Sequence, residues 1–213
     1  MATRAQRGRN YTLRMRTVVV ASLALVAWAP VVPQIDYATI WTKATPFHVF
    51  LENARARQEQ WRSRFADAAI DASALNDAKA LPAARKILAI AEDRCSDSAW
   101  AVPYLAKLAA AVPNRIELRV IGRREGNRIQ AEHLTPDGRR ATPTIVILDE
   151  EDRLLGTWVE RPAELQKWYI ENKPTVSSGE LHEHMDKWYA DDAGRSTITD
   201  VLAIMRRTAP EAR

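Results

Sequence analysis

Cysteine and glycine are both scarce in this chain of 213 residues. A single cysteine, Cys95, cannot pair within the chain, so a disulfide scaffold is excluded and only a disulfide to another molecule remains. The seven glycines leave little material for phosphate-binding loops, and neither a Walker loop nor a dinucleotide-binding fingerprint is present. The Gly-x-Ser-x-Gly pattern of serine hydrolases is also missing. Any chemistry that the chain performs therefore depends chiefly on Cys95.

The histidines do not form a metal-binding pattern. His182 and His184 are two positions apart, and on a helix such side chains point about 200° apart, so both cannot easily reach one ion. The other two histidines, His48 and His133, are isolated in the sequence. We therefore predict no metal site and no cofactor, and we interpret His182 and His184 as part of a solvated helix face.

The positive net charge of +4 comes from the beginning of the chain. Five of the 31 basic residues lie in the first 16 positions, which contain no acid, so 26 basic and 27 acidic residues remain for the rest. No basic face interleaved with aromatics follows, and we expect no specific nucleic-acid partner. Arg139 and Arg140 could hold an anionic group, although most such charge clusters are solvated loops. The five arginines of the first 16 positions are Arg4, Arg7, Arg9, Arg14 and Arg16.

An uncharged segment of 17 residues begins at Thr17 and ends at Pro33. A positive region followed by an apolar one is typical of an export signal, and Ala27-Trp-Ala29 offers a small-x-small cleavage site. Pro30 would follow that cut, which favours retention as an anchor, while 17 residues is about the lower limit for a membrane-spanning helix. We predict a protein of the cell envelope or associated with the membrane. The alternative is a cytoplasmic protein in which this segment has no function.

Aromatic residues at helical spacing indicate a helical lead before the first core strand. Thr45 is the expected N-cap of this helical stretch and Pro46 its first residue. Asp71 is placed to cap a further, shorter helix. An aromatic stripe of this kind can dock a partner but more often belongs to the core, so we expect it to pack on the sheet. The apolar residues of the stripe are Phe47, Phe50, Leu51, Ala54, Trp61 and Phe65.

The end of the chain predicts two more helices. Ser177 and Glu180 have the spacing of a capping box before the first of them, and Gly194 suits its exit. The second helix shows apolar residues at i, i+3, i+4 and i+7. This pair could cover a face of the sheet or build a groove beside Cys95, and the regular apolar repeat favours covering. The repeating residues are Ile198, Val201, Leu202 and Met205.

Cys95 directly follows an apolar run and begins an amphipathic helical pattern. A thiol at the start of a helix faces unpaired backbone N–H groups, which favour a thiolate over a thiol. The opposing interpretation is that a lone cysteine is a small buried apolar residue without reactivity. The helix-start position and the neighbouring Arg94 favour the reactive thiol.

The order of elements around Cys95 resembles the thioredoxin fold. A strand is followed by the cysteine-led helix with Pro103 inside it, a second strand, a helix, Thr142-Pro143 and a hairpin. The resemblance implies an α/β, three-layer structure with a central mixed sheet. It also implies that the Thr142–Pro143 bond is cis and faces the thiol. We expect about four strands, with the first two parallel, starting near Lys86, Ile116, Thr144 and Leu154.

Several segments between about residues 40 and 205 are similar to a group of bacterial thioredoxin-like proteins. This chain departs from the dithiol members of the fold at three positions. Arg94 replaces the tryptophan before the thiol, Ser98 replaces the second cysteine, and Ala89 replaces the buried acid. The similar segments are Glu92-Asp-Arg-Cys-Ser-Asp97, Val102-Pro103, Ile116-Glu-Leu-Arg-Val-Ile-Gly-Arg123, Gly156-Thr-Trp158, Arg161-Pro-Ala-Glu164 and Lys187-Trp-Tyr-Ala-Asp-Asp-Ala-Gly-Arg-Ser196.

The apolar content of 46% is enough for a sizeable core, and the length allows one domain with additions. We divide the chain into a basic and apolar N-terminal segment (1–34), a helical lead (35–82), a thioredoxin-like core (83–175) and a C-terminal helical extension (176–213).

The resemblance implies two alternative functions. In the first, Cys95 is the catalytic residue of a monothiol thiol–disulfide oxidoreductase and forms mixed disulfides with protein or small-molecule thiols, which an external thiol such as glutathione resolves. In the second, the protein is a redox-inactive binding module whose helical additions form a partner surface. Segment 149–156 lacks the Gly-Gly element of monothiol glutaredoxins, so we predict no shared iron–sulfur cluster. The expected active-site neighbours are Arg94, Asp97, Ser98, Thr142 and Pro143.

Overall fold

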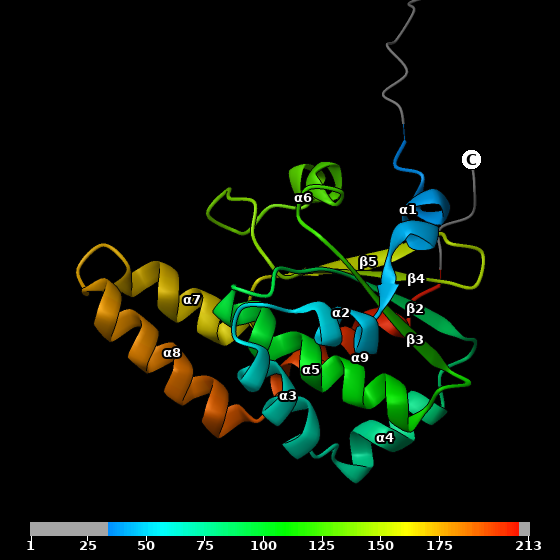
Figure 1. The fold of residues 1–213 in the computed structure, drawn as a ribbon, viewed down its shortest axis with the longest axis horizontal. Helices are drawn as coiled ribbons and strands as arrows, with labels where there is room; N and C mark the ends of the chain where they lie inside the picture. The colour runs from blue at the N-terminus through cyan, green and yellow to red at the C-terminus, as the bar shows by residue number, and fades with distance from the viewer. Residues whose placement is uncertain (1–33, 209–213) are drawn as a thin grey trace, which may run out of the picture. The chain divides into compact units, whose positions relative to one another are not determined.

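A computed structural model describes residues 34–208, and its centre is a mixed five-stranded sheet (Figure 1). The strand order is β1-β3-β2-β4-β5. Four of these strands match the predicted sheet, and β1 adds a short edge strand beside β3 that the sequence pattern did not indicate. The strands are β1 (Thr45–Pro46), β2 (Arg85–Ile90), β3 (Ile116–Ile121), β4 (Thr144–Leu148) and β5 (Leu154–Val159).

The pairing of the central strands confirms the predicted topology. Strand β2 runs parallel to β3, with Ala89 opposite Val120, and antiparallel to β4, with Ile87 opposite Ile147. Strand β5 pairs antiparallel with β4 and forms the other edge of the sheet. All five residues of β4 are buried, because helices cover both faces of the sheet.

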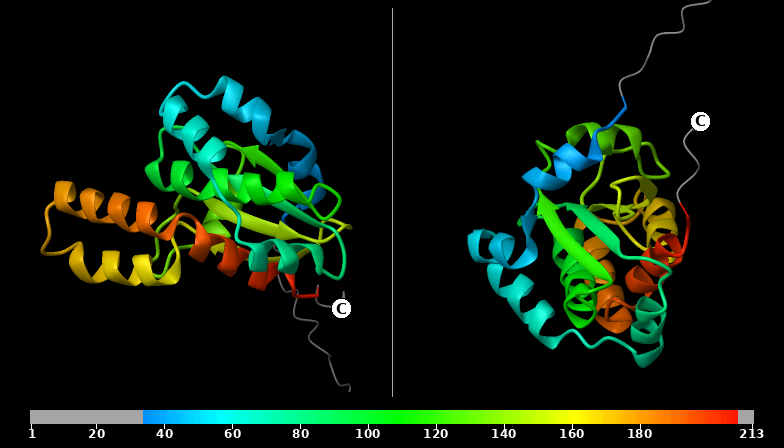
Figure 2. Two further views of the ribbon diagram at one scale, coloured as in Figure 1. Left: turned by 90° about the horizontal axis from the view of Figure 1, so that it is seen from below. Right: turned by 90° about the vertical axis from the view of Figure 1, so that its right-hand side faces the viewer.

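Alternate residues of β2 enter two separate hydrophobic clusters, which makes the fold three-layered. Ile87 and Ala89 pack in the cluster that includes Trp61. Leu88 and Ile90 pack on the other face with Trp41 and with Ile129. Figures 1 and 2 show α1 and α6 above the sheet, and α2, α3, α4, α5 and α9 below it. The helices are α1 (Tyr37–Lys43), α2 (Phe47–Asn53), α3 (Gln58–Asp67), α4 (Ala72–Lys79), α5 (Ser96–Ala111), α6 (Asn127–Glu132), α7 (Ala163–Asn172), α8 (Ser178–Asp192) and α9 (Arg195–Met205).

The helical stretch with the aromatic stripe starts one residue later than predicted, and it consists of two helices where the sequence pattern indicated one continuous stretch. Thr45 and Pro46 belong to β1, and Pro46 is the N-cap of α2 rather than its first residue. The stretch is then split into α2 and α3, because the Asp93 carboxylate accepts hydrogen bonds from the backbone N–H groups of Arg55 and Ala56, at 2.8 and 3.0 Å. The aromatic stripe packs into the core as expected. Asp71 is the N-cap of α4, although its side chain makes no capping hydrogen bond.

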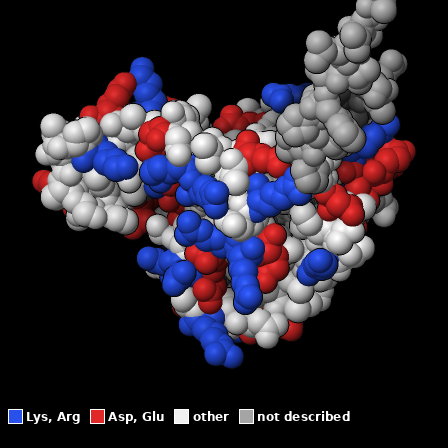
Figure 3. Space-filling model, turned by 90° about the horizontal axis from the view of Figure 1, so that it is seen from above, with Lys and Arg blue, Asp and Glu red and all other residues white. Residues whose placement is uncertain are grey.

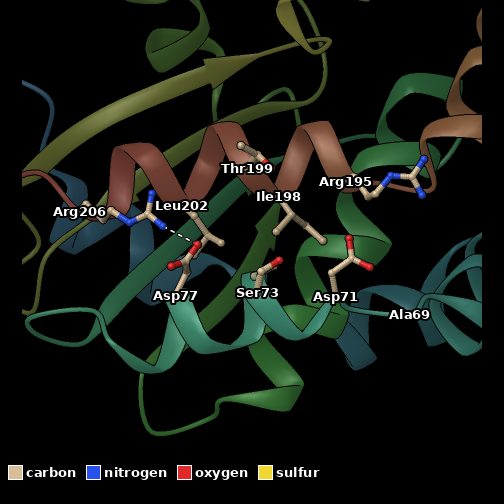
Figure 4. A pocket seen from close by; sticks show the side chains of 10 residues that line it. Ala69, Asp71, Ser73, Asp77, Arg195, Ile198, Thr199, Leu202 and Arg206 are labelled. Carbon is tan, nitrogen blue, oxygen red and sulfur yellow. Dashed lines mark ion pairs between the residues drawn. The ribbon is translucent and has the colours of Figure 1, made fainter.

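The C-terminal helices α8 and α9 agree closely with the sequence pattern. The capping box of α8 is complete: Ser177 Oγ accepts from the Glu180 N–H, and Glu180 Oε2 accepts from the Ser177 N–H. Ala193 and Gly194 both adopt left-handed conformations between the two helices. Helix α9 covers part of the sheet through its four predicted apolar residues, which are all buried. Figure 4 shows α9 packed along α4, with an ion pair between Arg206 and Asp77 at 2.7 Å.

In residues 34–208, no helix combines the length and apolar character needed to cross a membrane. The predicted signal or anchor that ends at Pro33 lies outside the described residues. Figure 3 shows basic and acidic side chains interspersed over the face that it displays.

Candidate functional site

Cys95 lies at the N-cap of α5, just beyond the carboxyl end of β2. Its side chain is half-buried, and its Sγ accepts a hydrogen bond from the backbone N–H of Ser98 at 3.5 Å. A cysteine in this place uses its sulfur as other N-caps use an oxygen. The predicted position of the thiol at a helix start is therefore confirmed.

The loop before β4 lies opposite the thiol. The Cys95 S–H donates a hydrogen bond to the carbonyl oxygen of Thr142, with 3.1 Å between sulfur and oxygen. The Thr142–Pro143 peptide bond is cis, as the resemblance implied. Further hydrogen bonds hold this loop in place, from the Glu160 N–H to the Pro143 carbonyl at 2.8 Å and from Thr144 Oγ1 to the Ala141 carbonyl at 2.8 Å.

Ser98 and Arg94 lie on either side of the thiol in the sequence and differ in exposure. Ser98 is fully buried, and its Oγ has no hydrogen-bond partner among residues 34–208. The Arg94 side chain is 74% exposed and pairs with Glu92 at 3.5 Å. Its backbone carbonyl accepts a hydrogen bond from Arg57 Nε at 2.9 Å. Ala89 is fully buried in β2, so no acid occupies that position.

Asp97, the remaining predicted neighbour, lies in a buried ion pair. Its carboxylate accepts hydrogen bonds from Arg161 Nε at 3.0 Å and Nη2 at 2.8 Å, and from the Tyr189 hydroxyl at 2.9 Å. Burial raises the pKa of Asp97 above its ordinary value, and the Arg161 guanidinium opposes that rise. Burial also raises the pKa of Tyr189 well above its ordinary value, so its hydroxyl stays protonated and donates to Asp97.

The ion pair continues as a chain of alternating charges toward the surface. Arg161 also pairs with the buried Glu160 at 2.9 Å, and Glu160 pairs with Arg139 at 2.9 Å. Arg139 in turn pairs with Asp137, and this hydrogen bond lowers the pKa of Asp137 to about 2. Burial acts to lower the pKa of Arg161, but the charges of Asp97 and Glu160 raise it above its ordinary value. Lys173 lies 3.7 Å from Asp137 at the surface end, so three basic side chains balance the three carboxylates of the cluster.

Sequence reasoning missed two members of this network, Glu160 and Gln166. Gln166 is buried, and its Oε1 accepts from Arg161 Nη1 at 3.2 Å. Arg161 and Tyr189 lie inside segments that carry the family resemblance, and this was the available signal for them. No periodicity distinguishes a buried charged residue from an exposed one.

The described residues contain no group of three or more His, Cys, Asp and Glu side chains that could hold a metal ion. His182 and His184 are both exposed, and the His184 ring stacks on Trp168 with 3.6 Å between ring centroids.

The mixed sheet, the cysteine at the start of α5 and the Thr142–Pro143 loop beside it define a thioredoxin-like protein. A family model described as Thioredoxin matches residues 44–175, and the chain belongs to this family.

Two solved structures are similar in fold. One is a protein of unknown function from Pseudomonas aeruginosa, with a TM-score of 0.64 and 22% identity, covering 81% of this chain and 98% of that one. The other is an HIV epitope-scaffold, with a TM-score of 0.62 and 22% identity, covering 79% of this chain and 96% of that one. At this identity the similarity shows the fold alone. A comparison with curated proteins gave no match.

Proposed function

We propose that this protein carries out thiol–disulfide exchange through the single thiol of Cys95. The observation that supports this most directly is the hydrogen bond from the Ser98 N–H to Cys95 Sγ at 3.5 Å, at the first turn of a helix of 16 residues. An amide aimed at sulfur and the positive end of a helix both stabilise a negative charge there. Cys95 is half-buried as a residue, so it is not sealed from a second molecule.

The reaction needs only thiols and a disulfide. The Cys95 thiolate attacks one sulfur of a disulfide R–S–S–R′, the S–S bond breaks, and R′ leaves as a thiolate that takes a proton from water. The mixed disulfide between Cys95 and R persists, because the Ser98 hydroxyl cannot displace sulfur. An external thiolate such as glutathione then attacks the R sulfur, which releases the Cys95 thiolate and forms a new disulfide between R and glutathione.

Glutathione disulfide provides the direct test. The folded full-length chain is incubated with it, and intact mass measurement detects the mixed disulfide, with Cys95→Ser as the control. Alkylation by iodoacetamide is followed across pH in the same samples. We expect a stable glutathione adduct and alkylation of the folded protein. Absence of an adduct, together with alkylation only after unfolding, would contradict the proposal.

That negative result would support the second candidate, a redox-inactive binding module. The observation that favours this alternative is the aromatic cluster where α7, α8 and α5 meet, in which Trp100, Trp168 and Trp188 are only partly buried. In the left view of Figure 2, α7 and α8 lie side by side and extend away from the sheet. In this candidate the S–H bond to Thr142 holds an unreactive thiol.

We further propose that the protein works in the cell envelope or at the membrane, through the basic residues of the first 16 positions and the uncharged segment 17–33. Its partners would be protein or small-molecule thiols and disulfides of that compartment. Disulfides persist in oxidising compartments, so substrates for exchange are available there.

A further inference from the structure

A second concave site lies between the edge strand β5 and helices α7 and α9. Its volume is about 490 Å³, which is within the range of small-molecule sites. The wall is mainly apolar, with a few polar groups that converge on it, and Arg161 and Gln166 are the lining residues that belong to the network described above. The residues that the argument uses are Trp158, Ala163, Gln166, Lys167, Glu171 and Asp200.

Gln166 supplies a hydrogen-bond donor that lacks an acceptor. The residue is 4% exposed, and its Oε1 is occupied by Arg161 Nη1 at 3.2 Å. Because Oε1 is fixed as the acceptor, Nε2 is the donor end of the amide, and it has no partner within residues 34–208. A buried N–H group without an acceptor is unfavourable, so a small shift of this amide toward a ligand oxygen in the cavity would be favoured.

The two cations around the cavity are already paired. Arg161 lies against Asp97 and Glu160, and Lys167 lies 3.9 Å from Glu171 on the same helix. Asp200 has no ion pair with any of the described residues; it accepts a hydrogen bond from Trp158 Nε1 at 3.1 Å, and burial raises its pKa, which disfavours its charged form. Because the lining offers no unpaired cation to hold an anion, the acceptor for the Gln166 N–H is best supplied by an uncharged molecule.

We propose that this cavity binds a small neutral molecule with a flat apolar body and a carbonyl oxygen, which accepts a hydrogen bond from Gln166 Nε2. The apolar body packs against Trp158 and Ala163. This site is distinct from the thiol, and its occupancy requires no reaction at Cys95.

Two probes of equal shape test the proposal: acetophenone, which has the carbonyl, and ethylbenzene, which lacks it. Each is titrated into the ¹⁵N-labelled full-length chain, and the side-chain amide signals of Gln166 and the indole N–H signal of Trp158 are followed by NMR, the indole signal serving for every variant. We expect a saturable shift of these signals with acetophenone. Ethylbenzene should bind about fivefold more weakly, as expected for one lost neutral hydrogen bond.

Three variants distinguish the carbonyl contact from general apolar binding. Gln166→Glu keeps the acceptor for Arg161 and removes the donor, so acetophenone should lose its advantage while ethylbenzene binds as before. Ala163→Trp is an exposed substitution at the start of α7 that fills the cavity, and both probes should stop binding. Glu164→Gln, on the same helix but outside the cavity, should change neither. Equal binding of the two probes to the natural chain, no saturable shift, or an advantage retained in Gln166→Glu would overturn the proposal.

Discussion

Ser98 occupies the position from which a second thiol would act on Cys95. Its amide already contacts the sulfur at 3.5 Å, and its buried hydroxyl has no partner among the described residues. A Ser98→Cys substitution places a thiol one turn away, within reach of an internal disulfide. Because no hydrogen bond is lost, the change should cost less than about 1 kcal/mol. On oxidation, the variant should form an internal disulfide between residues 95 and 98. In a reductase assay, its mixed disulfides should be released faster than those of the natural chain.

Ser96→Cys is the matched control for that prediction. Adjacent positions on a helix do not face each other, so this variant should keep the long-lived mixed disulfide. The readouts are intact mass after oxidation and reduction of a disulfide substrate by the reduced protein. Identical behaviour of Ser96→Cys and Ser98→Cys would contradict the geometry.

Asp97 should be important for stability because its partner Arg161 is buried with it. Asp97→Asn weakens two charge-assisted hydrogen bonds from Arg161, which keeps its pair with Glu160, so the free energy of unfolding should fall by about 2 kcal/mol. Lys187→Gln breaks a pair that is 75% and 68% exposed, and it should change the free energy by less than about 0.5 kcal/mol. Urea unfolding measures both. A loss no larger for Asp97→Asn than for Lys187→Gln would show that the buried pair is not needed.

The part of the site that the sequence predicted is the part that local pattern encodes. Cys95 follows from a helix start, and Ser98, Thr142 and Pro143 follow from the family resemblance of the short segments that contain them; the structure brings Cys95 against Ser98 and Thr142. Asp97 was named as a neighbour, but its partner Arg161 is 64 residues away. Nothing in the spacing of charges along a chain shows which of them will meet in the interior.

Among the elements, the turn between α8 and α9 has the least freedom to change. Gly194 adopts φ +76°, and a Cβ there would lie 2.3 Å from Tyr104 Cγ. Gly194→Ala should therefore combine left-handed strain with a ring clash and lower the free energy of unfolding by roughly 2–4 kcal/mol. Gly179→Ala, in α8 with nothing within 4 Å, should be neutral or stabilise by up to about 1 kcal/mol. The urea midpoints of both variants are compared with that of the natural chain. Equal shifts for Gly194→Ala and Gly179→Ala would be inconsistent with the clash.

Helix α1 is held in part by a histidine whose charge state matters. His133 contacts the Tyr37 hydroxyl at 3.5 Å and Thr157 Oγ1 at 3.3 Å. Burial lowers the pKa of His133 below the ordinary 6.5. As the pH falls below 6.5, His133 is therefore protonated more readily in the unfolded chain than in the folded one, and this favours unfolding. Stability should therefore fall as the pH drops below 6.5, and His133→Gln should flatten this part of the curve. Urea unfolding at a series of pH values measures the free energy of unfolding of the natural chain and of His133→Gln. The same dependence on pH in both proteins would exclude the effect.

At the scale of elements, a continuous apolar run predicted β2, the resemblance predicted β3 to β5, and a capping box and an apolar repeat of nearly four predicted α8 and α9. The two-residue strand β1 is too short to show a period. The break between α2 and α3 depends on Asp93, which lies 37 and 38 residues beyond the two amides that it holds. The apolar residues before and after the break keep helical spacing, so the sequence pattern did not show that the helix ends there.

For the whole molecule, the sharpest question is what the first 34 residues contribute. The sheet and the hydrophobic clusters lie within residues 35–208. Deletion of 1–34 should therefore leave the urea midpoint unchanged, while moving the protein out of the membrane or envelope fraction. Cell fractionation of both forms, with an unrelated cytoplasmic marker, is the measurement. A native protein that fractionates with that marker, and whose first residue lies near Tyr37, would rule out a signal or anchor.

The hydroxyl of Tyr189 reaches Asp97 from beyond the stretch that the family model matches, which ends at residue 175. The unit of sequence similarity is thus smaller than the unit that folds around the thiol. A shortened chain cut at that boundary would retain the whole stretch that the family model matches and still lose a hydrogen-bond donor to Asp97 in the first turn of α5.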